Sequence, residues 1–443
     1  MENPHPETEQ QKRLRAARRV VIKLGTGIVT GSDGQFNAEH LEPVARTIAR
    51  LKKDGRQIVL VSSGAVGLGR GRLCLHRDRL NDLVMRQACA AIGQSLLMHE
   101  YEKLFQVHGV HLAQVLLTEG DFVDRNRYSN LKQTMEALLK LGVLPIVNEN
   151  DTVSTAELDY LNIRAGERIF SDNDRLAALV MSHIEADVLI LLTDVEGLMQ
   201  MDAARSKAVA GKMRNDVIPS EARNPSSIDD QGKRDSSARR VLRNDVALSD
   251  VANSIDSAGI LIPLIEEISP ELRALALGPS EGGRGGMLTK LDAAEIAMRA
   301  GGVAVIANGK KPETLDRIFE GEPTGSVFLS KTRMAGKRRW IAYAAGVRGR
   351  VIVNAGARDA LTGGKASLLV TGVTGVEGEF DAAEVVSIVD AEGQEFARGI
   401  SDYSRTDAEG MIGNGANGQA GGRAGGRAGV LVKRDNIVLM DRK

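Results

Sequence analysis

The chain has 443 residues, with 58 basic and 58 acidic side chains, so its formal net charge is zero. This balance argues against a protein that mainly coats nucleic acid or anionic membrane, which would carry a large positive excess. Its two cysteines form no disulfide framework, and no apolar run approaches the ~18 residues of a membrane-spanning helix. Residues 1–17 form a polar tail without a signal-peptide pattern, so we expect a cytoplasmic protein with no membrane partner.

From residue 18 onward, apolar runs alternate with helical patterns. Strands are predicted at 19–24, 57–62, 111–117, 143–147, 187–193 and 303–307, and helices at 40–54, 79–108, 126–141, 174–184, 290–300 and 311–319. Strands separated by helices indicate a mainly parallel sheet sandwiched by helices, and apolar runs without alternation are typical of strands buried on both faces. We therefore predict an α/β domain over residues 18–335.

Residues 203–257 interrupt this pattern. They contain no aromatic residue and few aliphatic ones, a composition that cannot bury a core. The tetrapeptide Arg-Asn-Asp-Val occurs at Arg214 and again at Arg243. We interpret the segment as a disordered surface insertion, with a translated repeat element as a hypothesis for its origin. A functional lid is the alternative.

The pattern changes again after Trp340, to short apolar runs separated by turns. Strands are predicted at 349–353, 366–370, 378–380, 385–389 and 437–439, which indicates a small β-rich domain over 346–443. Within it, residues 414–429 form a Gly/Ala/Arg tract that we expect to be a flexible loop. The domain has 12 basic and 13 acidic residues, whereas RNA-binding domains normally have a basic face, so RNA binding is a minor alternative.

Polar residues follow four of the predicted strands directly. They are Lys23-Leu-Gly-Thr-Gly27, Ser62-Ser-Gly-Ala65, Asn148-Glu-Asn-Asp151 and Thr193-Asp194. In open parallel sheets ligands bind beyond the carboxyl ends of the strands, so the four turns predict one shared site.

Several of these residues suit an anionic ligand. Lys23 ends a buried strand, where an ammonium group needs an anion unless the side chain extends to the surface. The segment 282–290 is a glycine-rich turn that opens a helix with Lys290 in its first turn, as in phosphate-binding loops. Asp172-Asn-Asp174 starts another helix, where such residues either cap the helix or bind a ligand. His108 and His111 have no third ligand nearby, so we predict no metal site formed by protein ligands alone.

At segments 21–26, 61–65, 147–151, 172–174, 192–194 and 285–290 the chain resembles the amino-acid kinase family, within it the members that phosphorylate glutamate. Residues 349–389 resemble a PUA domain, a small β-barrel. The resemblance implies the amino-acid kinase fold and ATP- and Mg²⁺-dependent phosphorylation of the L-glutamate γ-carboxylate to L-glutamate 5-phosphate, the first step of proline biosynthesis. Another kinase of this fold, acting on acetylglutamate, aspartate or a nucleotide, is the alternative.

The resemblance also implies roles for individual residues. Catalytic roles fall on Lys23, Lys290 and Asp174, and glutamate binding on Ser63, Asp151 and Asn173. The ATP-binding residues would be Lys23, Gly25, Thr193, Asp194, Arg284, Gly285, Gly286, Met287, Leu288, Thr289 and Lys290. L-Proline is expected as a feedback inhibitor and the protein as a homo-oligomer. Arg284 and Ser171 depart from the family pattern, which bears on the nucleotide loop and the loop before Asp172.

Overall fold

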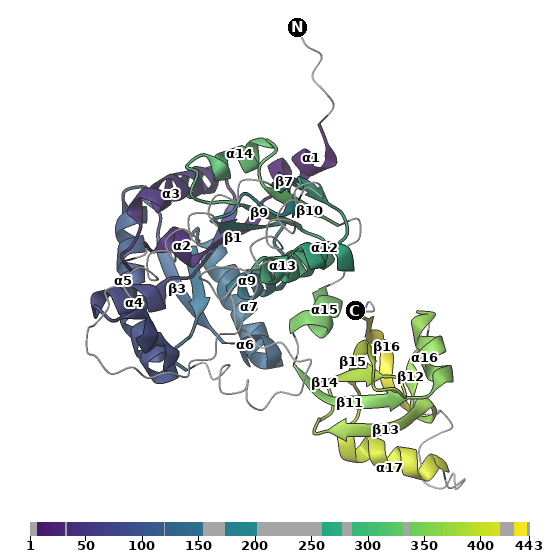
Figure 1. Cartoon of the computed structure of the whole chain (residues 1–443). Coiled ribbons are helices and arrows are strands. Elements are labelled where there is room, and N and C mark those ends of the chain that lie inside the picture. The colour runs from purple at the N-terminus through teal and green to yellow at the C-terminus, as the bar shows by residue number, and fades with distance from the viewer. Residues whose placement is uncertain are drawn as a thin grey trace, which may run out of the picture.

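The chain folds into a large α/β domain and a smaller β-rich domain (Figure 1). The computed structural model describes residues 7–31, 33–118, 120–153, 173–201, 259–276, 286–330, 336–344, 346–364, 366–416 and 429–440. The predicted insertion at 203–257 lies outside these ranges, as do Ser171, Arg284 and Gly285. Within them, no helix combines the length and the hydropathy needed to cross a membrane.

A mainly parallel sheet forms the centre of the large domain. Its described strands are β1 (Arg19–Leu24), β2 (Gln57–Ser62), β3 (Leu112–Leu117), β4 (Leu144–Glu149), β5 (Val188–Thr193), β8 (Leu264–Ile265), β9 (Val303–Asn308) and β10 (Ser326–Leu329). They lie in the order β3-β4-β2-β1-β5-β9-β10-β8, and only β9 and β10 pair antiparallel. The predicted sheet is thus confirmed. The strands β6 (Met199–Met201) and β7 (Gly259–Leu261) form a separate antiparallel ribbon.

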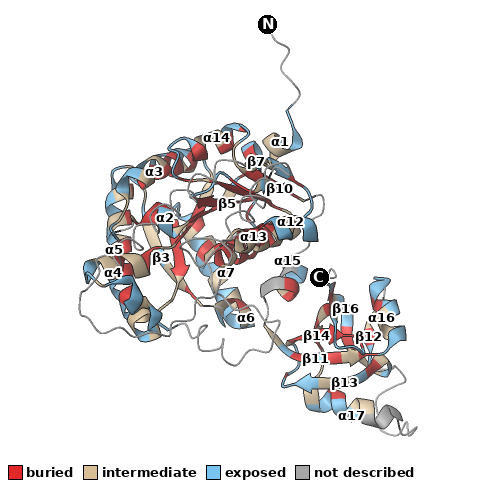
Figure 2. Cartoon of the chain, in the orientation of Figure 1, coloured by how far each residue is buried: buried red, intermediate tan, exposed pale blue. Residues whose placement is uncertain are grey.

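Helices cover both faces of this sheet. On one face pack α3 (Ala38–Lys53), α5 (Leu83–Gln106) and α14 (Thr314–Glu320), and on the other α7 (Arg125–Lys140), α9 (Asn173–His183) and α13 (Met287–Arg299). Because side chains alternate along a strand, Val20 and Ile22 of β1 enter the first core and Val21 enters the second. All three are fully buried, and each such burial contributes roughly 1.5–3 kcal/mol. The neighbouring strand β5 is likewise buried along its length (Figure 2).

The predicted helices all form, with ends shifted by local chemistry. Helix α5 begins at Leu83 instead of 79, because residues Arg77–Asn81 form a 3₁₀ turn and the Asp82 side chain caps the helix by accepting from the Val84 N–H. Helix α14 begins at Thr314 instead of 311, because Pro312 disfavours a helical conformation at the residue before it. Short helices precede or follow the strands at α2 (Thr26–Val29), α4 (Ala65–Arg72), α6 (Gly120–Val123) and α12 (Pro270–Leu275).

The segment expected to be a polar tail contains helix α1 (Glu9–Ala16). A capping box between Thr8 and Gln11 starts it, and Leu14 is buried in the core of the large domain. Arg13 donates to the carbonyl oxygen of Gly301 at 2.6 Å. The sequence analysis missed this helix because only one of its residues is apolar and buried, too few to produce an amphipathic pattern.

The small domain is a six-stranded sheet in its described part, ordered β12-β16-β15-β14-β11-β13. The strands are β11 (Val347–Val353), β12 (Leu368–Leu369), β13 (Val373–Gly378), β14 (Val385–Val389), β15 (Glu395–Ser401) and β16 (Val430–Leu439). Apolar side chains from all six strands and Phe380 form a core of its own. The β-rich fold predicted for this region is confirmed.

Three details of the small domain differ from the sequence prediction. The prediction of a strand at 378–380 is wrong, because β13 ends at Gly378. The φ of 81° at Gly378 turns the chain there, and Phe380 enters the core. Strand β15 and the helices α16 (Ala355–Thr362) and α17 (Arg405–Ala416) were not predicted. Glycines inside β15 and α17 interrupt the hydrophobic periodicity by which a strand or a helix is predicted from sequence. Helix α17 extends into the start of the expected loop at 414–429, and residues 417–428 lie outside the described ranges.

A cluster of rings joins the large domain to the segment that leads into the small one. The segment forms α15 (Gly336–Arg339) and a π-helical turn (Trp340–Ala344). Trp340 donates its indole N–H to the carbonyl oxygen of Phe122 at 3.2 Å. The Tyr128 ring lies between Trp340 and His183, with ring centroids 6.0 Å and 4.1 Å away. His183 ends α9 and is buried with neither ring nitrogen hydrogen-bonded.

The buried His183 is expected to make folding sensitive to acid. Burial lowers its pKa to about 4, and Lys132 shifts the pKa in the same direction. As pH falls below about 6.5 the unfolded chain takes up a proton at this residue while the folded chain does not. Between pH 7.5 and 5 this difference removes about 2 kcal/mol of the unfolding free energy. Urea unfolding of wild type and His183→Phe across this range measures it, and parallel pH profiles for the two proteins would contradict it.

Candidate active site

The four polar turns come together because of the strand order. β4, β2, β1 and β5 are neighbours in the parallel sheet, so their carboxyl ends meet at one edge. This edge carries the segments that follow Leu24, Ser62, Glu149 and Thr193. The single shared location predicted from the sequence is therefore present.

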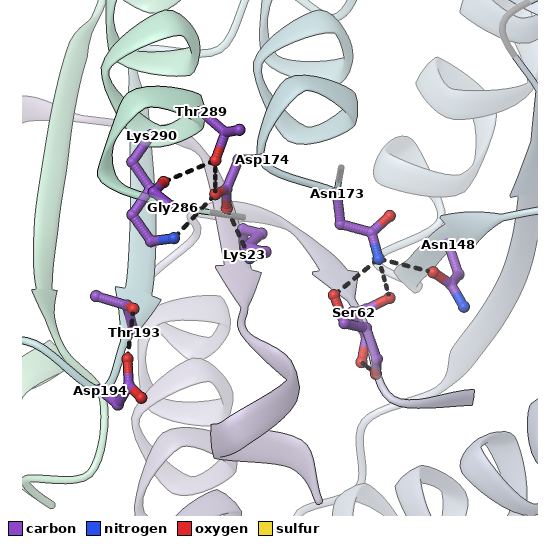
Figure 3. Close-up of polar contacts among 11 residues, drawn as sticks. Lys23, Ser62, Asn148, Asn173, Asp174, Thr193, Asp194, Gly286, Thr289 and Lys290 are labelled. Atoms are coloured by element: carbon purple, nitrogen blue, oxygen red, sulfur yellow. Dashed lines mark hydrogen bonds and ion pairs between the residues drawn. The ribbon is translucent and has the colours of Figure 1, made fainter. Parts of the chain in front are cut away.

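Two lysines from distant parts of the chain meet on one carboxylate at this edge (Figure 3). The Nζ of Lys23 lies 2.6 Å from Oδ1 of Asp174, and the Nζ of Lys290 lies 3.1 Å from Oδ2. The side chains are 6% and 8% exposed for the lysines and 0% for Asp174. Lys23 therefore does not extend to the surface, which was the alternative.

The local fold explains this meeting. Lys23 lies two residues after Val21 on β1, so it points to the same face, where α9 and α13 pack. Asp174 is the second residue of α9, where the helix dipole favours a negative charge. Lys290 lies in the first turn of α13, and α13 packs beside α9.

Within this group of three described side chains, two positive charges face one negative charge. Burial alone would raise the pKa of Asp174, but the attraction of Lys23 and Lys290 outweighs it and lowers the pKa to about 2. The carboxylate is thus ionised, and two ammonium groups share it. Because a buried charge without a counter-ion is costly, the remaining positive charge favours binding of an anion.

Glycines bring backbone close to this charged group. An added Cβ at Gly25 would lie 3.3 Å from the Leu192 carbonyl oxygen and 3.9 Å from Nζ of Lys23. Gly64 has a φ of 106°, and a Cβ there would lie 2.8 Å from a methyl carbon of Val29. Only glycine suits that backbone, which turns the chain from β2 into α4.

A second polar group lies beside the lysines. Asn173 donates from Nδ2 to Oγ of Ser63 at 2.8 Å, to Oδ1 of Asn148 at 3.1 Å and to the Ser62 carbonyl oxygen at 3.3 Å (Figure 3). Asp151 follows β4 in a turn and is half-buried. The structure thus joins Ser63 and Asn173 directly, and places Asp151 on the neighbouring turn.

The residues predicted for nucleotide binding fall into three groups. Thr193 and Asp194 end β5 and share a hydrogen bond of 3.2 Å. Gly286 precedes α13, and Thr289 donates to its carbonyl oxygen at 2.8 Å and to Asp174 at 3.2 Å. Met287 and Leu288 pack against the core beneath α13, so only their backbone is suited to a polar ligand.

The comparison with known proteins decides the family. Residues 18–227 match the amino acid kinase family, and residues 349–417 match the PUA domain. A glutamate 5-kinase from Moorella thermoacetica is 39% identical over 436 residues, covering 98% of this chain and 99% of that protein. One from Myxococcus xanthus is 39% identical over 403 residues, covering 90% of each. The chain belongs to the glutamate 5-kinase family.

Both resemblances expected from the sequence motifs are thereby confirmed. A third glutamate 5-kinase, from Thioalkalivibrio sulfidiphilus, is 38% identical over 98% of this chain and all of that protein. The alignments with the Moorella and Thioalkalivibrio proteins each cover 98% of this chain, so they include both of its domains.

The sequence analysis did not identify two polar residues that lie behind this candidate site. Gln94 and Tyr101 lie on α5, and their side chains contact Asn148 and Ser62, which lie at the carboxyl ends of β4 and β2. The Tyr101 hydroxyl lies 2.7 Å from Oγ of Ser62, and burial raises the pKa of Tyr101 well above its ordinary value. The hints in the sequence are Gly93 of α5 and Gly69 of α4, which let the two helices approach each other closely.

Proposed function

We propose that this chain transfers the γ-phosphoryl group of ATP to the γ-carboxylate of L-glutamate, giving L-glutamate 5-phosphate, the first step of proline biosynthesis. The observation that carries the proposal is the buried pair of lysines on one carboxylate, beside the Ser63–Asn173 pair. The site thus combines a place for transferring phosphate with a polar pocket for a small acceptor.

The chemistry needs charge neutralisation more than acid–base catalysis. A glutamate γ-carboxylate with a pKa near about 4.3 is ionised at neutral pH, so it attacks without losing a proton. The obstacle is the approach of this anion to the γ-phosphate. Lys23 and Lys290 would stabilise the charge on the transferring phosphoryl oxygens, and Asp174 would hold both lysines in place.

The two substrates would approach from opposite sides of the lysines. We assign glutamate to Ser63, Asn173 and Asp151, on the side of β2 and β4. L-Proline, the expected feedback inhibitor, shares its α-carboxylate and α-amino group with glutamate, and we assign it to the same pocket. We assign ATP to the backbone around Gly25 and Gly286, with Thr193 and Asp194 at the end of β5. Association into a homo-oligomer is part of the same proposal.

The described side chains suit a Mg²⁺ ion that arrives with the nucleotide. Among them no group of three acidic, histidine or cysteine side chains could hold a metal ion. Mg²⁺ usually binds through substrate phosphates, waters and one or two carboxylates. Asp174 is already paired with two lysines, whereas Asp194 follows β5 on the side assigned to ATP and is exposed, so its carboxylate would be suited to the ion. When bound, the ion would neutralise charge on the ATP phosphates.

A choice of acceptors tests the proposed function. The purified chain is given ATP and one acceptor at a time: L-glutamate, L-aspartate, N-acetyl-L-glutamate, carbamate or UMP. Acyl phosphate products are trapped with hydroxylamine and measured as hydroxamates, and ADP release is followed in parallel. We expect L-glutamate to give the highest kcat/KM by a wide margin. Preference for another acceptor would assign the chain to a different kinase activity of the same fold.

A further inference from the structure

Three amide side chains form a line of hydrogen bonds behind the proposed glutamate pocket. Asn173 donates from Nδ2 to Oδ1 of Asn148 at 3.1 Å, and Asn148 donates from Nδ2 to Oε1 of Gln94 at 2.9 Å. Asn148 is 2% exposed and Gln94 is 9% exposed. The three residues come from α9, β4 and α5, so the line connects three elements at the edge of the sheet.

The direction of this line is set at one end. The Ser62 carbonyl oxygen can only accept, so the atom of Asn173 that faces it at 3.3 Å must be the nitrogen. Asn148 must then present its oxygen to Asn173 and its nitrogen to Gln94. Gln94 in turn presents its oxygen, Oε1, to Asn148.

In the part of the chain that the structure describes, this arrangement leaves two buried atoms of the line without a hydrogen-bond partner. They are Oδ1 of Asn173 and Nε2 of Gln94. Since an unsatisfied buried polar atom costs roughly 1–3 kcal/mol, such atoms at a site indicate a group that completes them. Oδ1 of Asn173 is an acceptor on the residue already assigned to the substrate, and an α-ammonium group is a donor that glutamate carries.

Close backbone packing holds Gln94 against this pocket. A Cβ on the preceding residue, Gly93, would lie 1.7 Å from the carbonyl oxygen of Ala65, so α5 directly contacts the first residue of α4. A Cβ at Gly69 would lie 1.9 Å from the Cys89 carbonyl oxygen, which extends the same contact along α4. Gln94 therefore has little freedom to move away from Asn148.

We propose that Gln94 is a positioning residue for the amino-acid substrate. By accepting from Asn148 it holds Oδ1 of Asn148 against Asn173, and this keeps Oδ1 of Asn173 directed at the α-ammonium group of the substrate. Gln94 thereby raises the preference for acceptors that carry a free α-amino group. The inference rests on the proposed function, because it assigns a specificity role within the same glutamate pocket.

The test compares L-glutamate with glutarate, which has the same two carboxylates but no α-amino group. Gln94→Met has nearly the same volume and removes both amide atoms, so Asn148 loses its acceptor. We expect kcat/KM for glutamate to fall about tenfold, as loss of one well-aligned hydrogen bond predicts, and kcat/KM for glutarate to change less than about twofold. The KM for ATP and the melting temperature should stay near wild type.

Gln94→Glu is the matched control, because its side chain has the same shape and keeps an oxygen that accepts from Asn148. Glutarate has a net charge of −2 and glutamate a net charge of −1 with an ammonium group, so a new negative charge disfavours glutarate more. The ratio of kcat/KM for glutamate to that for glutarate should therefore stay at or above the wild-type value. Asn148→Leu breaks the line at its middle and should lower the ratio as Gln94→Met does. It provides a second measurement if Gln94→Met does not fold.

The outcomes separate the inference from the proposed function. A wild-type chain that does not phosphorylate glutamate refutes the proposed function itself. A wild type that does, together with folded Gln94→Met and Asn148→Leu variants of unchanged ratio, refutes the positioning role alone. Equal losses on both acceptors, with a raised KM for ATP and a lower melting temperature, would assign Gln94 a merely structural role.

Discussion

Replacing Lys290 by methionine is expected to lower kcat about 10²–10³-fold while the KM for glutamate changes less than about threefold. Lys290 is paired with Asp174 on the α13 side of the site, away from Ser63 and Asn173. Its ammonium group would therefore act on the transferring phosphoryl group, where charge changes during the reaction, and not on the bound acceptor. Steady-state hydroxamate formation at saturating ATP measures both constants.

The fold of this variant should survive, which makes the kinetic result interpretable. Removing Lys290 leaves Lys23 and Asp174 as a buried pair of opposite charge, so no buried charge remains without a partner. Lys311→Met is the matched control, since Lys311 is half exposed and pairs with Glu196 at the surface. Turnover near wild type in both Lys290→Met and Lys23→Met would refute the proposed role of the lysines.

The strands of the large domain were predictable because burial on both faces leaves few alternatives. Runs such as 19–24 and 57–62 are mostly apolar, and the structure has strands with the same bounds. Lys23 stood out because it interrupts such a run. Its partner could not be predicted from residue patterns, since Asp174 lies about 150 residues away and meets it only through the crossover connections between strands.

Gln94 shows why part of the site could not be predicted. It lies in the middle of a long helix, far from any turn that follows a strand, and its neighbours in the sequence give no ligand motif. Its position at the site depends on how closely α5 approaches α4, and this depends on Gly69 and Gly93. In the sequence, this close packing of α4 and α5 is indicated only by Gly69 and Gly93.

The small domain was harder to predict element by element because its strands are short and interrupted. Strand β15 contains Arg398 and Gly399, and still forms because it is paired on both sides, with β14 and β16. Local preference is weak here compared with the burial of Phe396 and Ala397 in the domain core. The sequence therefore identified the type of domain better than the limits of its elements.

Replacing Asp174 by asparagine is expected to damage both stability and activity, in contrast to the lysine variant. Asparagine keeps the shape of the side chain but removes the negative charge that pairs with both buried lysines, Lys23 and Lys290. Breaking a buried ion pair by removing one partner typically costs about 3–5 kcal/mol. We expect a loss of this size in unfolding free energy at pH 7 and a fall in kcat of at least about 100-fold.

The loss of stability in Asp174→Asn should become smaller when an anion is bound. This dependence tests the electrostatic explanation. Phosphates of ATP would supply the negative charge that Asp174→Asn lacks, so saturating ATP should raise the melting temperature of the variant more than that of wild type. Asp316→Asn is the matched control: Asp316 pairs with the half-exposed Arg50, and surface pairs contribute about 0–1 kcal/mol. An equal shift with ATP in all three proteins would contradict this explanation, because the anion would then compensate for no missing charge.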